Sequence, residues 1–182
     1  VLADRKPLGV VKRGIQLIAC GMIITAVTWI VYPQGFVVFG ILHLIGFGTI
    51  LSLPFLSKKI KWYIPALFGI VIVGLSFFLE GHTGSLLLLP FGLPYAGFVS
   101  LDYEPLIPWF GVLLLGLAAG KLLYPSGRCH LLSGLSQMPV FLRPICFVGR
   151  HTLVIYMLHV PVIILMVFLL FLDGSIIVPG PS

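Results

Sequence analysis

Long apolar runs, separated by short polar or proline-containing breaks, dominate the pattern of this chain. The runs lie at residues 10–32, 36–56, 62–79, 106–124 and 152–172, and each is near the length of a helix that crosses a bilayer. Pro33-Gln34-Gly35 follows the first run, and Glu80-Gly81-His82 follows the third. The pattern predicts an all-α integral membrane protein, in which a bundle of five transmembrane helices forms a single domain over residues 1–182.

The charged residues predict how these helices cross the membrane. All eleven lysines and arginines fall at one alternating set of run ends and loops. Four of the five acids, Glu80, Asp102, Glu104 and Asp173, fall in the other set. Because basic residues in short loops are retained on the cytoplasmic side, we expect the N-terminus inside and the C-terminus outside.

Composition excludes several classes of protein. The chain is 59% hydrophobic and only 9% charged, so it lacks the polar residues that a water-facing shell needs. The net charge of +6 lies at the predicted inner helix ends, where anionic lipid headgroups explain it better than nucleic acid does. Its three cysteines have no CxxC spacing, and no metal-binding motif occurs, so we expect no metal site.

The segment 83–108 is apolar but is broken by four prolines and several glycines. An unbroken helix is disfavoured there, because proline removes a backbone donor and clashes with the preceding turn. Two interpretations stay open: a Pro/Gly-rich outer loop that re-enters the membrane, or a loop that lies at the interface. In the fourth run, Gly116 and Gly120 have GxxxG spacing, which favours the close approach of another helix.

Two histidines lie inside apolar runs, where an ionisable group is costly and is a functional candidate. His159 shares a helix face with Tyr156, near Arg150 at the predicted inner end. With Lys121 from the fourth run, these residues could form a cationic pocket for a phosphate-bearing ligand. The alternative is that His159 caps a carbonyl freed by Pro161 while the cations reach the lipid headgroups.

His43 lies in the outer half of the second run, on the same side of the membrane as Asp102. A carboxylate beside a histidine is the minimal equipment for general-base catalysis. We therefore expect His43 and His159 both to face the protein interior, with Asp102 nearer to His43 than to His159. The alternative is an acidic interfacial loop, anchored by the aromatic rings of Tyr103 and Trp109.

Three strings occur in order along the chain: FGILHLIG at 39–46, LDYEPLIPWFG at 101–111 and GRHTLVIYMLH at 149–159. Together they resemble the prokaryotic integral-membrane members of the heparan-alpha-glucosaminide N-acetyltransferase catalytic-domain family, whose wider relatives are membrane acyltransferases. The resemblance implies transfer of acetyl from cytoplasmic acetyl-CoA to an amino sugar or other acceptor on the outer side. It also implies a location in the plasma membrane of a prokaryote.

The resemblance stops near the N-terminus. Family members begin with a further membrane helix, bearing an Arg-Gly…Met…His pattern that includes the catalytic histidine, and nothing before residue 10 matches it. We therefore expect the chain to be N-terminally incomplete, and that histidine is assigned to no position here.

Two functions of different classes remain. The first is a transmembrane acetyltransferase with acetyl-CoA as co-substrate. Its catalytic candidates are His43, Asp102 and His159, and its candidates for binding coenzyme A are Lys121, Arg150 and Tyr156. The second is a non-catalytic membrane protein, either a small-solute transporter or a partner subunit. A transporter predicts inverted repeats, and the sequence has no internal repeat. The sequence names neither the acceptor nor the oligomeric state, and a homo-oligomer stays open.

Overall fold

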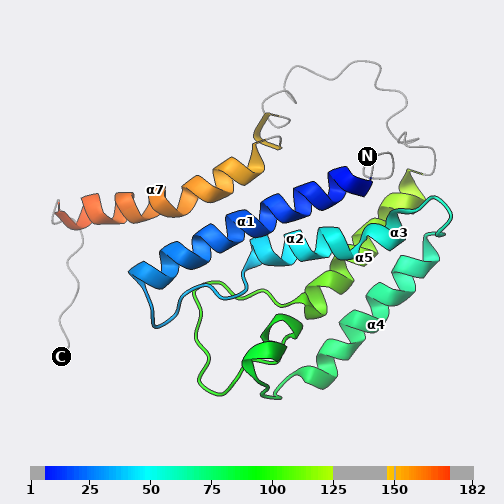
Figure 1. Cartoon of the computed structure of the whole chain (residues 1–182), viewed down its shortest axis with the longest axis horizontal. Helices are drawn as coiled ribbons and strands as arrows, with labels where there is room; N and C mark the ends of the chain where they lie inside the picture. The colour runs from blue at the N-terminus through cyan, green and yellow to red at the C-terminus, as the bar shows by residue number, and fades with distance from the viewer. Residues whose placement is uncertain (1–6, 125–146, 150, 173–182) are drawn as a thin grey trace. The chain divides into compact units, whose positions relative to one another are not determined.

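Helices account for the regular secondary structure in the part of the chain that is described. The computed structural model describes residues 7–124, 147–149 and 151–172. It divides into two units, Val1–Leu131 and Leu132–Ser182, and each is considered by itself. The second unit contains α7 (Thr152–Leu172). The helices of the first unit are α1 (Pro7–Val31), α2 (Ile41–Leu51), α3 (Leu53–Leu56), α4 (Tyr63–Leu79), the 3₁₀ helix η1 (Leu86–Phe91) and α5 (Leu106–Leu123) (Figure 1).

The predicted all-α class is confirmed for the described residues, which contain an isolated β-bridge but no strand. α1 and α5 are long and apolar enough to cross a membrane, judged by length and composition. α4 and α2 are apolar but shorter, with 17 and 11 residues. α7 begins and ends where the fifth apolar run does. The complete set of five crossings stays a prediction.

The second apolar run differs from its predicted form. A helix was expected over 36–56, but α2 begins at Ile41, and a break at Ser52 separates it from the short α3. Residues before Gly40 are instead held by backbone hydrogen bonds to the segment around residue 103. A long-range pairing thus replaces the first turn of the expected helix.

Two pairs of helices pack through reciprocal glycines. α1 and α2 lie side by side (Figure 1), and a Cβ atom built on Gly14 would lie 3.0 Å from the carbonyl oxygen of Gly46. A Cβ on Gly46 would lie 2.9 Å from the carbonyl oxygen of Gly14. In α4 and α5, a Cβ on Gly69 or on Gly111 would lie 2.8 Å from the other residue's carbonyl oxygen. Small residues therefore let the two backbones of each pair approach closely.

The GxxxG spacing noted in the sequence plays no part in these crossings. A Cβ on Gly116 or Gly120 would meet no described atom within 4 Å. The close approach of another helix that is expected at these glycines stays a prediction. The glycines that pack are spread over four helices and have no common spacing within one helix.

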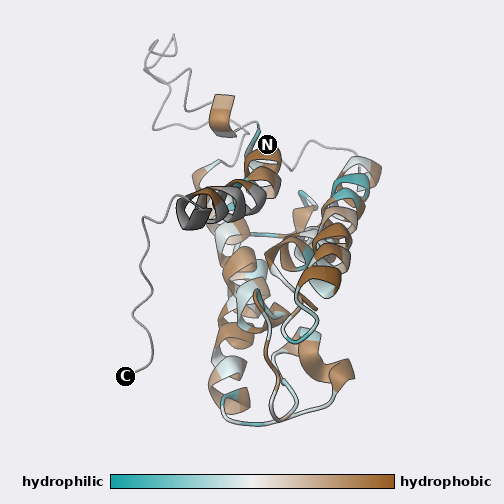
Figure 2. Ribbon diagram, turned by 90° about the vertical axis from the view of Figure 1, so that its left-hand side faces the viewer, coloured by the Kyte–Doolittle hydropathy of each residue, from teal (hydrophilic) through white to brown (hydrophobic). Residues whose placement is uncertain are grey.

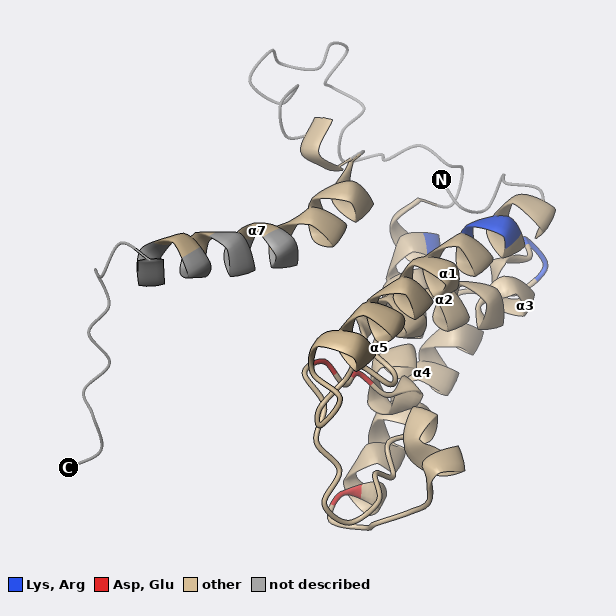
Figure 3. Ribbon diagram, turned by 60° about the vertical axis from the view of Figure 1, so that its left-hand side comes forward, with Lys and Arg blue, Asp and Glu red and all other residues tan. Residues whose placement is uncertain are grey.

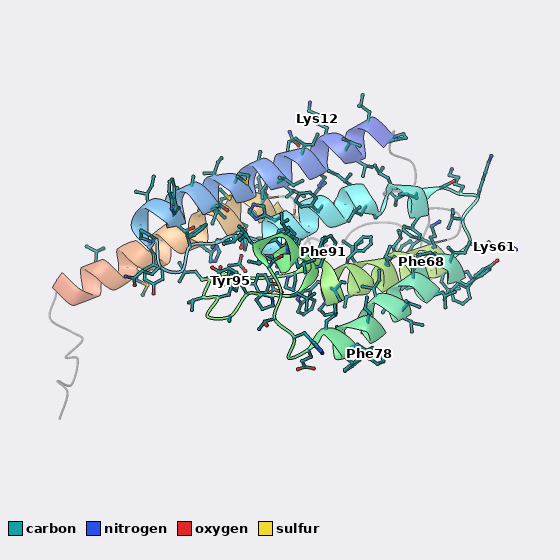
Figure 4. The ribbon with its side chains drawn as sticks, turned by 60° about the horizontal axis from the view of Figure 1, so that its bottom comes forward. Lys12, Lys61, Phe68, Phe78, Phe91 and Tyr95 are labelled. Atoms are coloured by element: carbon teal, nitrogen blue, oxygen red, sulfur yellow. The ribbon has the colours of Figure 1, made fainter. Side chains whose placement is uncertain are left out.

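Charged residues separate to opposite ends of the first unit. Figure 3 shows lysine and arginine at one end of its described helices, and aspartate and glutamate at the other. In Figure 4, Lys61 of the loop before α4 lies toward one side of the first unit, and Tyr95 of the loop between α4 and α5 lies toward the opposite side. The alternation of charge read from the sequence thus becomes a separation in space.

The outward faces of these helices are apolar over most of their length (Figure 2). Large hydrophobic side chains such as Ile30 on α1, and Phe77 and Phe78 on α4, are more than 70% exposed. An apolar surface this extensive suits a lipid environment and is rare on a protein surrounded by water.

Replacement of Gly69 by alanine should destabilise the protein, because the added methyl group would meet the backbone of α5 and the helices would have to separate. Overpacking of this kind costs about 1–3 kcal/mol of unfolding free energy. Gly74, in the same helix, meets no described atom within 4 Å of an added Cβ, so Gly74→Ala is the matched control. Thermal unfolding in detergent should show a lower midpoint for Gly69→Ala alone. Equal midpoints for the two variants would contradict the glycine crossing.

Candidate functional site

The candidate site begins where two segments, more than 60 residues apart in sequence, run side by side. Phe39 and Tyr103 form a parallel β-bridge. The backbone N–H of Glu104 donates to the carbonyl oxygen of Phe39 at 2.9 Å, and that of Leu101 donates to the carbonyl oxygen of Gly35 at 2.8 Å. This pairing brings Asp102 of the outer loop to the first residue of α2.

Asp102 holds the N-terminus of α2. Its Oδ2 atom accepts a hydrogen bond from the backbone N–H of Ile41 at 3.1 Å. The first N–H groups of a helix have no partner within the helix, and a carboxylate there is also favoured by the helix dipole. A Cβ atom at position 40 would overlap Oδ2, so only glycine at that position lets the carboxylate approach this closely.

His43 lies in the first turn of α2 and is buried, with 4% of its surface exposed. The burial expected from the sequence is therefore observed. Its Nδ1 atom accepts a hydrogen bond from the backbone N–H of Gly40 at 3.3 Å. The imidazole also stacks on Phe39, with ring centroids 5.6 Å apart, and the charge of Asp102 acts on it. The sequence-based pairing of His43 with Asp102 thus corresponds to two side chains that hold one helix end.

The residue of α1 that lies against this imidazole is a glycine. A Cβ atom on Gly21 would lie 2.8 Å from Cε1 of His43 and 3.0 Å from each of its ring nitrogens. Within the described residues, Nε2 of His43 is buried and has no hydrogen-bond partner. One nitrogen of the ring is therefore fixed by the backbone, and the other is left without a partner.

Two threonines of α1 belong to the same region, and sequence analysis did not identify them. The hydroxyl of Thr28 donates to the carbonyl oxygen of Ile24 at 2.8 Å and accepts from the backbone N–H of Val37 at 3.0 Å. The hydroxyl oxygen of Thr25 is buried and has no partner among the described residues. The available signal was the spacing Gly21, Thr25, Thr28, which places small and polar residues on one helix face.

The loop between α4 and α5 covers the site with an apolar cluster. Leu89 of η1 is 1% exposed and packs with Phe39 and Leu44. The hydroxyl of Tyr103 donates to the carbonyl oxygen of Leu89 at 2.6 Å, which ties η1 to the paired segment. Leu87, in the same turn, is 85% exposed. The loop is thus packed against α2 through one face, and its position relative to a membrane surface stays a prediction.

Burial changes the protonation behaviour of this loop. It raises the pKa of the Tyr103 hydroxyl, which therefore stays a hydrogen-bond donor toward Leu89. Burial also raises the pKa of the Glu104 carboxyl, and the negative charge of Asp102 raises it further. The Glu104 carboxyl is therefore harder to ionise than a carboxyl in water.

Lys121, at the end of α5, contacts backbone at the basic end of the unit. Its Nζ atom donates to the carbonyl oxygen of Ser57 at 2.9 Å and to that of Ile60 at 2.6 Å. These contacts tie the α3–α4 loop to α5, a role that the sequence did not predict. Binding of an anionic ligand by Lys121 stays a prediction.

In the second unit, His159 contacts Tyr156, as the shared helix face predicted. Its Nδ1 atom meets the carbonyl oxygen of Tyr156, and the two rings have centroids 5.0 Å apart. Arg150 lies outside the described residues. The expected convergence of His159 with Arg150 and Lys121, and its orientation toward the protein interior, stay predictions.

No group of three histidine, cysteine, aspartate or glutamate side chains that could hold a metal ion occurs among the described residues. The chemistry available at the candidate site is that of a buried imidazole, a helix-bound carboxylate and a buried hydroxyl.

Comparison with known proteins gives this arrangement a family. The family model described as heparan-alpha-glucosaminide N-acetyltransferase, catalytic, matches residues 3–161. No curated protein and no solved structure matches the chain. The match includes all three strings that carried the resemblance, and it spans α1 to α5 and the first half of α7. The chain therefore belongs to the heparan-alpha-glucosaminide N-acetyltransferase catalytic-domain family.

Proposed function

We propose that the chain forms the membrane-embedded part of an acetyltransferase. It takes acetyl from acetyl-CoA at its basic, cytoplasmic end and passes it to an amino sugar or other acceptor at its acidic, outer end. Family membership supports the acetyl chemistry, and the separation of charge within the first unit supports the two-sided arrangement. Basic ends are retained in the cytoplasm during insertion, which gives the orientation.

The observation that carries this proposal is the buried His43, whose Nε2 atom has no hydrogen-bond partner among the described residues. An unsatisfied polar atom away from water costs roughly 1–3 kcal/mol, so a stable fold keeps few of them. Here the imidazole is held from one side by the backbone of α2 and lies beside a carboxylate. Such a preorganised polar atom in an apolar surround is suited to act on a ligand.

Each remaining candidate has a proposed role. Asp102 positions the first turn of α2 and supplies negative charge on the acceptor side. We assign Lys121, Arg150 and Tyr156 to the binding of the phosphates and ribose of coenzyme A, because charge-assisted hydrogen bonds to phosphate are strong. We assign His159, together with His43 and Asp102, to the catalysis of the transfer.

Replacement of His43 by alanine should abolish acetyl transfer, because it removes a buried polar atom that has no partner among the described residues and is poised for a ligand. We expect a loss of at least about 100-fold in the rate of transfer from labelled acetyl-CoA to glucosamine by the full chain in proteoliposomes. His82, an exposed histidine of the same outer loop region, provides the control, and His82→Ala should keep the rate. Equal rates in the two variants would remove His43 from the site.

Replacement of Arg150 by alanine should weaken coenzyme A binding about tenfold, because one charge-assisted contact to phosphate is lost. Lys121→Ala should do the same, and its thermal midpoint should be recorded because it also frees two loop carbonyls. Lys12→Ala removes the same charge from an exposed position at the basic end and serves as the control. Calorimetric titration in detergent measures all three affinities. A similar loss in every variant would mean general electrostatic attraction instead of a site.

The orientation predicts which loops are reached from outside the cell. In a variant without native cysteines, a cysteine at position 57 should resist an impermeant thiol reagent until the cells are opened. A cysteine at position 83 should react in intact cells. Labelling of position 57 from outside, or of position 83 only after lysis, would reverse the direction of transfer.

A further inference from the structure

Two side chains of the first unit have a buried polar atom with no partner among the described residues, and they lie on facing helices. These atoms are Oγ1 of Thr25 on α1 and Nε2 of His43 on α2. A single unpartnered polar atom can be a small imperfection of packing. Two of them between the same pair of helices suggest that both serve one ligand. The proposed function uses His43 but gives no role to Thr25.

The hydrogen bond at Nδ1 decides which nitrogen of His43 carries the proton. Gly40 donates its backbone N–H to Nδ1, so Nδ1 must present its lone pair. A neutral imidazole has one protonated nitrogen, and its proton must then be on Nε2. The unpartnered atom is therefore a hydrogen-bond donor. It has no lone pair with which to take a proton from a substrate.

The register of α1 against α2 places Thr25 close to this donor. Gly21 packs on the imidazole of His43, and Thr28 accepts from the backbone of Val37. Thr25 lies between them on the same face of α1, one turn beyond Gly21, and side chains at this spacing are about 5–6 Å apart. Unlike Thr28, Thr25 does not donate to the carbonyl oxygen four residues before it. Its hydroxyl proton is thus available.

We propose that His43 Nε2–H and the Thr25 hydroxyl form a two-donor site for one oxygen atom, the carbonyl oxygen of the acetyl group in transfer. The inference rests on the proposed function and assigns His43 a donor role instead of the general-base role expected from the sequence. Two donors aimed at one oxygen stabilise the negative charge that develops on it during acyl transfer.

His43 keeps its proton throughout the proposed reaction. The acceptor amine bonds to the carbonyl carbon, and the carbonyl π pair moves to the oxygen held by the two donors. The electron pair on the oxygen then re-forms the C=O bond, and the C–S bond breaks. The proton lost by the amine ends on the sulfur of coenzyme A. The products are an amide and a free thiol, and no oxidant or further reactant is needed.

Variants that separate donation from proton acceptance test the role of His43. Glutamine supplies an N–H donor but cannot act as a base near neutral pH, whereas methionine supplies neither. We expect His43→Gln to transfer acetyl within about tenfold of the wild-type rate, and His43→Met to lose at least about 100-fold. Thr25→Ser should keep the rate that Thr25→Val loses. Equal inactivity of the Gln and Met variants would overturn the donor role.

Nitrogen NMR on protein labelled with ¹⁵N-histidine gives a readout that does not depend on activity. The signals of His43 are assigned by their loss in His43→Gln. The expected result is a protonated Nε2 and an unprotonated Nδ1. The opposite tautomer would overturn the inference, whatever the enzyme transfers.

A ligand pair distinguishes this inference from the proposed function. The probes are coenzyme A and its acetonyl thioether, which carries a ketone oxygen where the acetyl group would lie. The wild type should bind the acetonyl thioether about tenfold more tightly than coenzyme A. His43→Met and Thr25→Val should each lower this ratio of the two affinities. An unchanged affinity ratio in both variants would contradict the two-donor site and would leave the acetyl-CoA proposal intact. Failure of both probes to bind would contradict both the acetyl-CoA proposal and this inference.

Discussion

The carboxylate of Asp102, bonded to the N-terminus of α2, is the contact on which the acidic end of the first unit depends. A helix that begins in apolar surroundings exposes N–H groups that water cannot reach, and each one needs a partner. Asp102 accepts from Ile41, and His43 accepts from Gly40. The same two side chains that make the candidate site therefore also make it possible for α2 to start where it does.

Glycine has a second role in the same architecture, because it sets how near the helices lie. Between apolar helices in lipid, association depends on close contact more than on exclusion of water. The pair Gly14 and Gly46 brings α1 onto α2, and Gly21 then leaves room for an imidazole where any other side chain would not fit. The depth at which His43 is held thus follows from the crossing of two backbones. A site built in this way is rigid, since moving the ring requires moving a helix.

The sequence was sufficient for features that depend on local pattern. Apolar length located α1, α4, α5 and α7 to within a few residues, and the alternation of charge anticipated the two ends of the first unit. It failed at residues 36–40, because their partners lie more than 60 positions away and no periodicity records that pairing. Thr25 was missed for a similar reason. A threonine in an apolar run is ordinary until the helix beside it is known.

Lys121 shows the same limit at the basic end. The sequence places a cation there but does not reveal that two loop carbonyls already accept from it. Backbone acceptors carry no sequence signature, so they are the partners that pattern reasoning overlooks most easily. His43 and Asp102 were easier to pair, because both are ionisable and both belong to the same predicted layer.

The position of His43 along α1 has a consequence for what can reach it. Gly21, which touches the ring, is ten residues from one end of α1 and fourteen from the other. At 1.5 Å per residue, the ring is about 15 Å from the nearer end and about 21 Å from the farther one. Any group that arrives there must first lose its hydration shell, and for a phosphate that loss is prohibitive, whereas for a neutral acyl group it is small. The depth of the ring thus acts as a solvation filter, which admits the small uncharged part of a large charged molecule and leaves the rest at the surface.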